Sequence, residues 1–262
     1  MSKILPLKRF GQNYLQDQNI IRKIISEIDP KEKDVIIEIG PGQGALTQHL
    51  VKLKSNFSAI EIDKRVIDDL RNRFERIRII QQDFLEVDLS EFYKDNKNRL
   101  RIVGNIPYNI TSPILFKLFD NNKIIKDAIL MVQLEVAKRM TAKIGTKDYG
   151  ILSVLLNYFG TVVLAFKVSR NNFYPKPNVD SAIVHIFFNE ERIDTEFNSM
   201  FKSIVKSSFG NRRKTLKNSL SNSIFADIDF SNSGIDLSNR AEQLNVDDFI
   251  KLAKFAQQNK SR

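Results

Sequence analysis

Short apolar runs alternate with amphipathic stretches over the first two thirds of the chain. The stretches 45–54 and 65–74 have the spacing of helices, and the apolar window 151–166 indicates a buried helix followed by a buried strand. This alternation predicts a parallel, doubly wound sheet with helices on both faces, closed by a hairpin-like pair of strands at one edge. The predicted strands are 35–40, 57–62, 77–82, 101–105, 128–133, 162–168 and 181–188.

The pattern changes after Asn189. Strand-like runs stop, and helical patterns rich in lysine, serine and asparagine continue to the end of the chain. We therefore predict an α/β domain over residues 1–189 and a small, all-helical domain over residues 190–262.

The chain is strongly basic, with 41 lysines and arginines against 31 acidic residues and a net charge of +10. This balance favours a polyanionic partner, either a nucleic acid or an anionic membrane surface, and charge alone does not choose between them. Cysteine is absent, which excludes disulfides and a thiol nucleophile. The window 151–166 is interrupted by Asn157 and Gly160 and is shorter than the roughly 20 residues of a membrane helix. Because no apolar stretch of signal-peptide length opens the chain, the sequence predicts a cytoplasmic protein.

A glycine-rich turn follows the first predicted strand, where residues 38–45 read E-I-G-P-G-Q-G-A. Glycines there let the backbone turn tightly and let a ligand approach closely, although an ordinary structural turn is the simpler explanation. The turn fits a dinucleotide fingerprint, because Glu61 follows Gly40 by 21 residues, where a carboxylate would hold a ribose. The same geometry serves S-adenosylmethionine, so this motif does not separate the two cofactors.

Polar residues also end the third and fourth predicted strands. Asp83 can accept a hydrogen bond from an adenine amino group, although a capping aspartate is the simpler explanation. The motif Asn105-Ile-Pro107-Tyr108 lies at the sheet edge where open α/β folds bind ligands. The amino nitrogen of adenine is a poor nucleophile, and an asparagine oxygen with a backbone carbonyl can hold it toward a methyl donor. Pro107 stiffens this loop, Tyr108 offers a face on which a base can stack, and the chemistry needs no metal.

With these motifs the chain resembles the bacterial KsgA/RsmA family, the small-subunit ribosomal RNA adenine dimethyltransferases. The resemblance implies a Rossmann-like S-adenosylmethionine-dependent methyltransferase sheet with a small C-terminal all-helical domain. Seven ordered motifs carry it over nearly the whole length: K-R-F-G-Q-N-Y-L (8–15), E-I-G-P-G-Q-G-A-L-T (38–47), A-I-E-I-D (59–63), Q-D-F-L (82–85), N-I-P-Y-N-I-T-S-P (105–113), F-Y-P-K-P-N-V-D-S-A (173–182) and F-G-N-R-R-K-T-L-K-N-S-L (209–220).

The resemblance also implies a reaction and its residues. The family methylates the exocyclic amino nitrogen of two adjacent adenosines near the 3′ end of 16S ribosomal RNA, in a pre-ribosomal small subunit, and we expect this chain to do so as a monomer. An N-terminal segment would cover the cofactor, and Phe173 would stack on the target adenine opposite Tyr108. The expected cofactor residues are Gln12, Asn13, Leu15, Gly40, Gly42, Glu61, Asp83 and Asn105, and the expected catalytic residues are Asn105, Pro107, Tyr108 and Phe173.

Close relatives of this family methylate a large-subunit adenine instead. Pro41 in the glycine turn and the basic stretch F-G-N-R-R-K-T-L favour the small-subunit branch. Within that stretch we expect Arg212, Arg213 and Lys214 to bind RNA, although a solvated face is the usual explanation of a charge run.

Two other functions stay open at this stage. An NAD-dependent oxidoreductase would use a similar sheet, but it leaves the motif at residues 105–108 unexplained. A non-catalytic RNA-binding or ribosome-assembly factor could have kept the fold, although the complete set of cofactor residues argues against it.

Overall fold

The computed structural model describes residues 5–7, 11–52, 56–75, 77–96, 98–189, 195–211 and 213–260. The chain divides into two compact units, one made of Met1–Ala137 with Val163–Asn189 and the other of Lys138–Val162 with Glu190–Arg262. The predicted boundary at 189/190 placed residues 138–162 in the α/β domain, whereas here they group with the C-terminal helices. The chain leaves the sheet after residue 133, contributes residues 138–162 to the second unit, and then returns to the sheet. A single boundary cannot describe this path.

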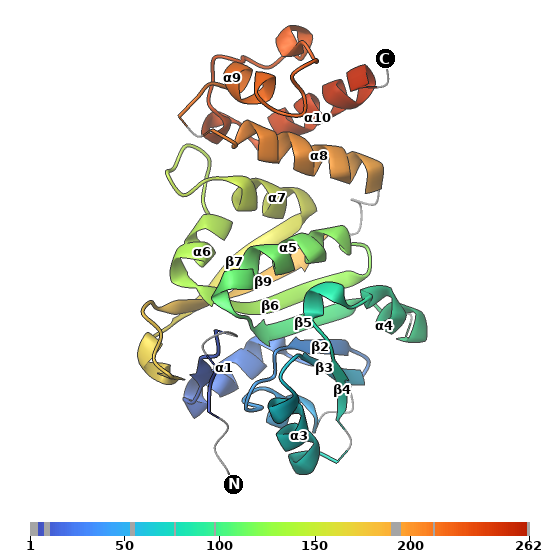
Figure 1. The fold of residues 1–262 in the computed structure, drawn as a ribbon, viewed down its shortest axis with the longest axis vertical. Helices are drawn as coiled ribbons and strands as arrows, with labels where there is room; N and C mark the ends of the chain where they lie inside the picture. The colour runs from blue at the N-terminus through green and yellow to red at the C-terminus, as the bar shows by residue number, and fades with distance from the viewer. Residues whose placement is uncertain are drawn as a thin grey trace. The chain divides into compact units, whose positions relative to one another are not determined.

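The first unit is built on a seven-stranded sheet of order β4-β3-β2-β5-β6-β9-β7 (Figure 1). Neighbouring strands are parallel from β4 to β6, and β9 runs antiparallel to β6. The predicted parallel sheet with two later strands at one edge is therefore confirmed. The strands are β2 (Val35–Ile39), β3 (Asn56–Glu61), β4 (Arg78–Gln81), β5 (Leu100–Asn105), β6 (Ile125–Gln133), β7 (Gly160–Val168) and β9 (Ser181–Phe188).

Both faces of the central strands are buried. Ile36 and Val103 pack in a cluster with isoleucines of helix α1. Ile37 and Ile102, whose side chains point to the opposite face, are also fully buried. Near-continuous apolar runs are typical of parallel strands covered on two sides. The helices of this part of the chain are α1 (Gln18–Ile28), α2 (Thr47–Leu50), α3 (Lys64–Arg73), α4 (Leu89–Asn96), α5 (Thr111–Asp120) and α6 (Leu134–Met140).

Three strands differ from the prediction or escaped it. The predicted buried strand at the end of the 151–166 window is β7, whose residues are mostly half-buried or exposed, with only Phe166 and Val168 buried. β7 is the last strand in the sheet order, and an edge strand is less covered than a central one. β1 (Tyr14–Leu15) and β8 (Phe173–Tyr174) form a separate antiparallel pair. Strands of two residues are too short to give a readable pattern.

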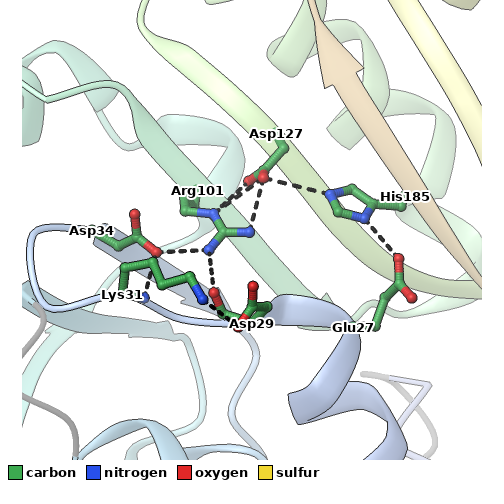
Figure 2. Close-up of polar contacts among 7 residues, drawn as sticks. All are labelled: Glu27, Asp29, Lys31, Asp34, Arg101, Asp127 and His185. Carbon is green, nitrogen blue, oxygen red and sulfur yellow. Dashed lines mark hydrogen bonds and ion pairs between the residues drawn. The ribbon is translucent and has the colours of Figure 1, made fainter.

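A buried charge network anchors α1 to the sheet at the amino-terminal ends of β2 and β5. Arg101 donates hydrogen bonds to Asp127 at 2.9–3.1 Å and to Asp34 at 2.7 Å. Figure 2 shows His185 between two carboxylates, with Nδ1 2.8 Å from Glu27 of α1 and Nε2 3.4 Å from Asp127. Burial by itself lowers the pKa of His185, but the hydrogen bonds to Asp127 and Glu27 outweigh it and raise the pKa.

Replacing His185 by alanine is expected to destabilise the protein most at acidic pH. The folded pKa of His185 lies above its unfolded value, so its contribution is complete below the unfolded pKa and is lost as the pH rises through the folded pKa. Removing one partner of a buried charged network costs about 3–5 kcal/mol. Urea unfolding of the wild type and His185→Ala over a pH series measures the difference, which should shrink as the pH rises.

The variant His49→Gln is the matched control. Burial and the nearby Lys52 and Arg22 lower the pKa of His49, so its contribution to stability should be lost as the pH falls. A His185→Ala effect that stays constant or grows with rising pH contradicts the assigned charge state of His185.

As far as its residues are described, the second unit consists of helices and turns apart from the start of β7. Tyr158 of α7 stacks on Phe201 of α8 with ring centroids 3.8 Å apart, and its hydroxyl donates to Asn198 Oδ1 at 2.8 Å. In the described parts of the chain, no helix is long and apolar enough to cross a membrane. The helices of this unit are α7 (Ile151–Phe159), α8 (Thr195–Ser208), α9 (Leu216–Ser221) and α10 (Val246–Lys260).

Candidate active site

A cavity of about 340 Å³ lies at the carboxyl ends of β2, β3, β4 and β5, within the roughly 300–1,000 Å³ usual for small-molecule sites. The strand order changes direction between β2 and β5, and open α/β sheets bind ligands at such a point. The cavity wall contains every residue predicted for the cofactor and all but Phe173 of those predicted for catalysis: Gln12, Asn13, Leu15, Gly40, Gly42, Glu61, Asp83, Asn105, Pro107 and Tyr108.

The glycine-rich turn forms one side of the cavity. Gly40 and Gly42 adopt φ angles of 60° and 53°, a region that favours glycine. A Cβ on Gly40 would meet no atom within 4 Å, whereas a Cβ on Gly42 would lie 3.0 Å from the ring of Tyr14. The turn is therefore open toward the cavity at Gly40 and closely covered at Gly42. A turn whose backbone is uncovered at Gly40 fits a ligand that must approach the main chain.

Glu61 ends β3 and is hydrogen-bonded to the glycine-rich turn. Its Oε1 accepts hydrogen bonds from the backbone N–H groups of Ile62 and Asp63, both at 2.9 Å, and its Oε2 accepts one from Gly42 at 3.4 Å. Burial raises the pKa of Glu61, and these backbone hydrogen bonds offset that effect only in part. The carboxylate is thus fixed in the cavity wall and oriented by the main chain.

Asp83 follows β4 and caps the short helical turn η2 (Phe84–Glu86). One carboxylate oxygen accepts the N–H of Leu85 at 2.9 Å, and the other has no further partner among the described residues. The capping explanation is therefore correct, and an acceptor is still left at the cavity. Lys117 of α5 steadies the same turn, because its Nζ donates to the carbonyls of Leu85 at 2.9 Å and Val87 at 2.6 Å.

Asn105 ends β5 and joins the sheet to the N-terminal segment. Its Nδ2 donates a hydrogen bond to the backbone carbonyl of Asn13 at 2.9 Å. No described residue donates to its Oδ1, so the amide presents a defined acceptor at the cavity wall. Orientation of this kind is what an amide needs if it is to hold an amino group in one geometry.

Tyr108 lies on the loop that follows Asn105 and is held by β9, which is two strands away from β5 in the sheet. Its hydroxyl lies 2.7 Å from Oγ of Ser181, the first residue of β9. Burial, above all, raises the pKa of Tyr108, so the hydroxyl stays protonated at neutral pH. Pro107 precedes it as the cap of the turn η3 (Tyr108–Ile110). The aromatic ring is therefore fixed at the cavity wall.

Phe173 is not part of the cavity wall. It pairs with Leu15 in the β1–β8 ladder, is only 5% exposed, and packs in the apolar cluster that contains Ile183. The neighbouring Tyr174 is 47% exposed, because adjacent residues of a strand point to opposite sides. Its stacking on the target base, opposite Tyr108, stays a prediction.

The N-terminal segment is tied to the connection between β3 and α3. Gln12 donates to Asp63 Oδ2 at 3.1 Å and accepts the N–H of Leu7 at 2.8 Å. Arg65 forms an ion pair with the same carboxylate at 2.6 Å. Segments that are far apart in the sequence therefore meet at the cavity. The link between Gln12 and the β3–α3 connection is its hydrogen bond to Asp63.

Sequence reasoning missed several residues of this site. Glu38 of β2 lines the cavity, accepts a hydrogen bond from Thr47 at 2.7 Å, and has a pKa raised to about 8 by burial. It stands within the glycine motif, but nothing in the motif separates a buried carboxyl from an exposed one. Tyr14 and Lys117 were missed because their contacts involve segments that are distant in the sequence. In the described residues no three acidic or histidine side chains gather into a metal site.

The predicted RNA-binding residues fall in the second unit. Arg213 and Lys214 are exposed in the turn before α9, and Arg212 lies outside the described residues. The exposure of Arg213 and Lys214 agrees with a surface that binds RNA phosphates, and it agrees equally well with a solvated face.

Comparison with known proteins identifies the family. A model of the ribosomal RNA adenine dimethylase family matches residues 7–258. The chain belongs to this family. The resemblance inferred from its motifs is thereby confirmed, and the oxidoreductase alternative is wrong. The chain is a ribosomal RNA methyltransferase of that family.

Relatives match this dimethylase-family chain over nearly its whole length. The ribosomal RNA small subunit methyltransferase A of Chlorobium phaeobacteroides (strain BS1) is 46% identical over 97% of this chain and 94% of its own. The protein of the same name from Francisella tularensis subsp. novicida (strain U112) is 43% identical over 95% and 96%.

Solved structures agree with this placement. A dimethyladenosine transferase from Plasmodium falciparum has a TM-score of 0.78 and 27% identity, covering 93% of this chain and 98% of that one. The 23S rRNA methyltransferase ErmE has a TM-score of 0.67 and 25% identity, covering 94% and 100%. The expected Rossmann-like methyltransferase fold is confirmed.

Proposed function

We propose that this chain transfers methyl groups from S-adenosylmethionine to the exocyclic amino nitrogen of two adjacent adenosines near the 3′ end of 16S ribosomal RNA. The observation that carries the proposal is the amide of Asn105, which lines the cavity at the switch point of the sheet and is anchored through its nitrogen on Asn13, while its oxygen has no partner among the described residues. The relatives at 43–46% identity, both named as small-subunit enzymes, support this target rather than the large subunit.

The cofactor would lie along the glycine turn. When bound, S-adenosylmethionine supplies an electrophilic methyl group to the amino nitrogen of the target adenine and leaves as S-adenosylhomocysteine, and the displaced amino proton passes to solvent. The bare backbone at Gly40 would allow close approach, the carboxylate of Glu61 would accept the hydroxyls of the cofactor's ribose, and the second oxygen of Asp83 would accept the amino group of the cofactor's adenine. Gln12, Asn13 and Leu15, which line the cavity, would cover the cofactor on this side.

The target adenine would enter at the end of β5. Asn105 Oδ1 and a backbone carbonyl of the following loop accept the two amino hydrogens, so the nitrogen lone pair is held out of conjugation with the ring. Tyr108, fixed by Ser181, is the platform on which the extruded base stacks. Phe173 completes the stack if the β1–β8 segment moves when RNA binds.

The substrate would be the RNA of a pre-ribosomal small subunit, and the enzyme would act as a monomer. To test this, small subunits that lack these methyl groups are incubated with the protein and S-adenosylmethionine, and the digested RNA is analysed by mass spectrometry. The proposal predicts dimethyladenosine in the small-subunit RNA. Tight binding to the particle without any methylated adenosine would instead identify a non-catalytic assembly factor.

The basic stretch provides a separate prediction about RNA binding. Replacing Arg212, Arg213 and Lys214 together by alanine should weaken binding to the particle and flatten its salt dependence, by about 0.7–0.9 in log–log slope for each phosphate that is no longer neutralised. The matched control removes the same charge from the exposed Lys64, Lys123 and Lys126 of the first unit. An unchanged slope in the first variant means that this stretch is only a solvated face.

A further inference from the structure

Lys117 of α5 is hydrogen-bonded to the short turn that carries Asp83. Its Nζ donates to two carbonyls at the C-terminal end of η2, that of Leu85 at 2.9 Å and that of Val87 at 2.6 Å. The backbone hydrogen bonds of the turn itself use the carbonyls of Asp83 and Phe84. The ammonium therefore holds one end of a turn whose other end is capped by the side chain of Asp83.

Lys117 contacts this turn from outside the cavity wall. Asp83 and Phe84 line the cavity, whereas Lys117 does not. Its Nζ lies 5.7 Å from the centre of the Phe84 ring, within the range of a cation–π contact. The ring of Phe84 is only 4% exposed, so burial anchors it independently of Lys117. Asp83 is half-buried, and the only described residue that donates to its carboxylate is Leu85, so its position depends on the turn.

Lys117 and Asp83 attract each other without forming an ion pair. Burial lowers the pKa of Lys117, and the charges of nearby carboxylates, Asp83 among them, offset that effect only in part. Among the described residues, however, the hydrogen bonds of Nζ go to the two carbonyls, and the second oxygen of Asp83 has no partner. Lys117 thus acts on Asp83 through the main chain of the turn and leaves that oxygen to a ligand.

We propose that Lys117 is a positioning residue for cofactor recognition: by holding η2 against α5, it places the second oxygen of Asp83 where it accepts the amino group of the cofactor's adenine. This inference rests on the S-adenosylmethionine site proposed above and adds to it a residue outside the cavity wall. An acceptor held in one geometry binds an amino group better than a loosely held one, because less freedom is lost on binding. Lys117 therefore sets how strongly the protein prefers adenine to a base without that amino group.

The test is the variant Lys117→Met, which keeps a long side chain and removes its charge and its donors. Calorimetry measures the affinity for S-adenosylhomocysteine and for S-nebularylhomocysteine, the analogue whose purine base lacks the amino group. In the wild type we expect S-adenosylhomocysteine to be preferred by about 10-fold or more, the value of a hydrogen bond to a charged group. In Lys117→Met its affinity should fall by about 5- to 10-fold and that of the analogue by less than about 2-fold.

Two further variants complete the test. Lys117→Arg keeps a cation with several donors, so it should retain more of the preference than Lys117→Met, and it provides the test if the methionine variant does not fold. Lys123→Met is the matched control, because Lys123 is exposed in the turn after α5 and does not line the cavity. It should change neither affinity.

The other outcomes overturn the inference. Equal losses of affinity for both ligands in Lys117→Met show that the residue only supports the cavity wall. Wild-type affinities for both ligands show that the turn does not need Lys117, and lower stability in urea with an unchanged preference shows a purely structural role. A wild type that binds neither ligand refutes the cofactor site itself, and one that binds both equally refutes the role of Asp83. These two failures are distinguishable, because they appear before any residue is replaced.

Discussion

Replacing Asn105 by alanine is expected to reduce methyl transfer by about 10²- to 10³-fold, the usual cost of removing one preorganised hydrogen-bonding group from a reacting centre. The change removes the oxygen that would hold the adenine amino group, and also the hydrogen bond to Asn13. The glycine turn and Glu61 are untouched, so binding of S-adenosylhomocysteine should stay measurable. Single-turnover methylation of small subunits and calorimetry with S-adenosylhomocysteine separate the two effects.

A matched variant tests whether the position matters or only the amide. Asn109 is exposed on the turn that follows Asn105 and also lines the cavity, so Asn109→Ala removes the same group from the same loop. It should retain most of the activity. Near-normal turnover by Asn105→Ala, with its thermal unfolding unchanged, would remove Asn105 from the proposed mechanism.

Replacing Glu61 by alanine is expected to weaken cofactor binding by about 100-fold, because hydrogen bonds to a charged group contribute about 1.5–3 kcal/mol. The variant removes the proposed ribose acceptor and leaves the N–H groups of Gly42, Ile62 and Asp63 without their acceptor. The conservative variant Glu61→Gln keeps one acceptor oxygen and should fall between the wild type and Glu61→Ala. Equilibrium binding of S-adenosylhomocysteine measures all three proteins.

The control for Glu61 is Glu86→Ala, because Glu86 is an exposed carboxylate of the neighbouring turn η2. Its removal changes the net charge equally and should leave the affinity unchanged. Equal affinities of Glu61→Ala and the wild type would mean that the cofactor does not use this end of the cavity.

The residues at strand ends could be predicted because the geometry of a parallel sheet is itself predictable. Glu61, Asp83 and Asn105 each end or follow an apolar run, and parallel strands bring their carboxyl ends to one edge. The positions of these side chains in one cavity wall therefore follow from the strand pattern and the strand order. Their roles toward cofactor and RNA stay predictions.

The remaining features depend on contacts between distant segments. Phe173 lies in an apolar cluster because a two-residue strand pairs it with Leu15, and such a strand leaves no periodic signal. Tyr14 reads as an ordinary aromatic residue until its ring is found against Gly42 in the cavity wall. The grouping of residues 138–162 with the C-terminal helices was missed because local patterns reveal elements, not which elements pack together.

The most direct test of the proposed activity is transfer of tritium from labelled S-adenosylmethionine to small subunits that lack these methyl groups, with large subunits in parallel and Asn105→Ala as the inactive reference. We expect label in small-subunit RNA, recovered as dimethyladenosine, and background label in the large subunit. Label in the large subunit, or wild-type label no higher than that of Asn105→Ala, would contradict the proposed activity.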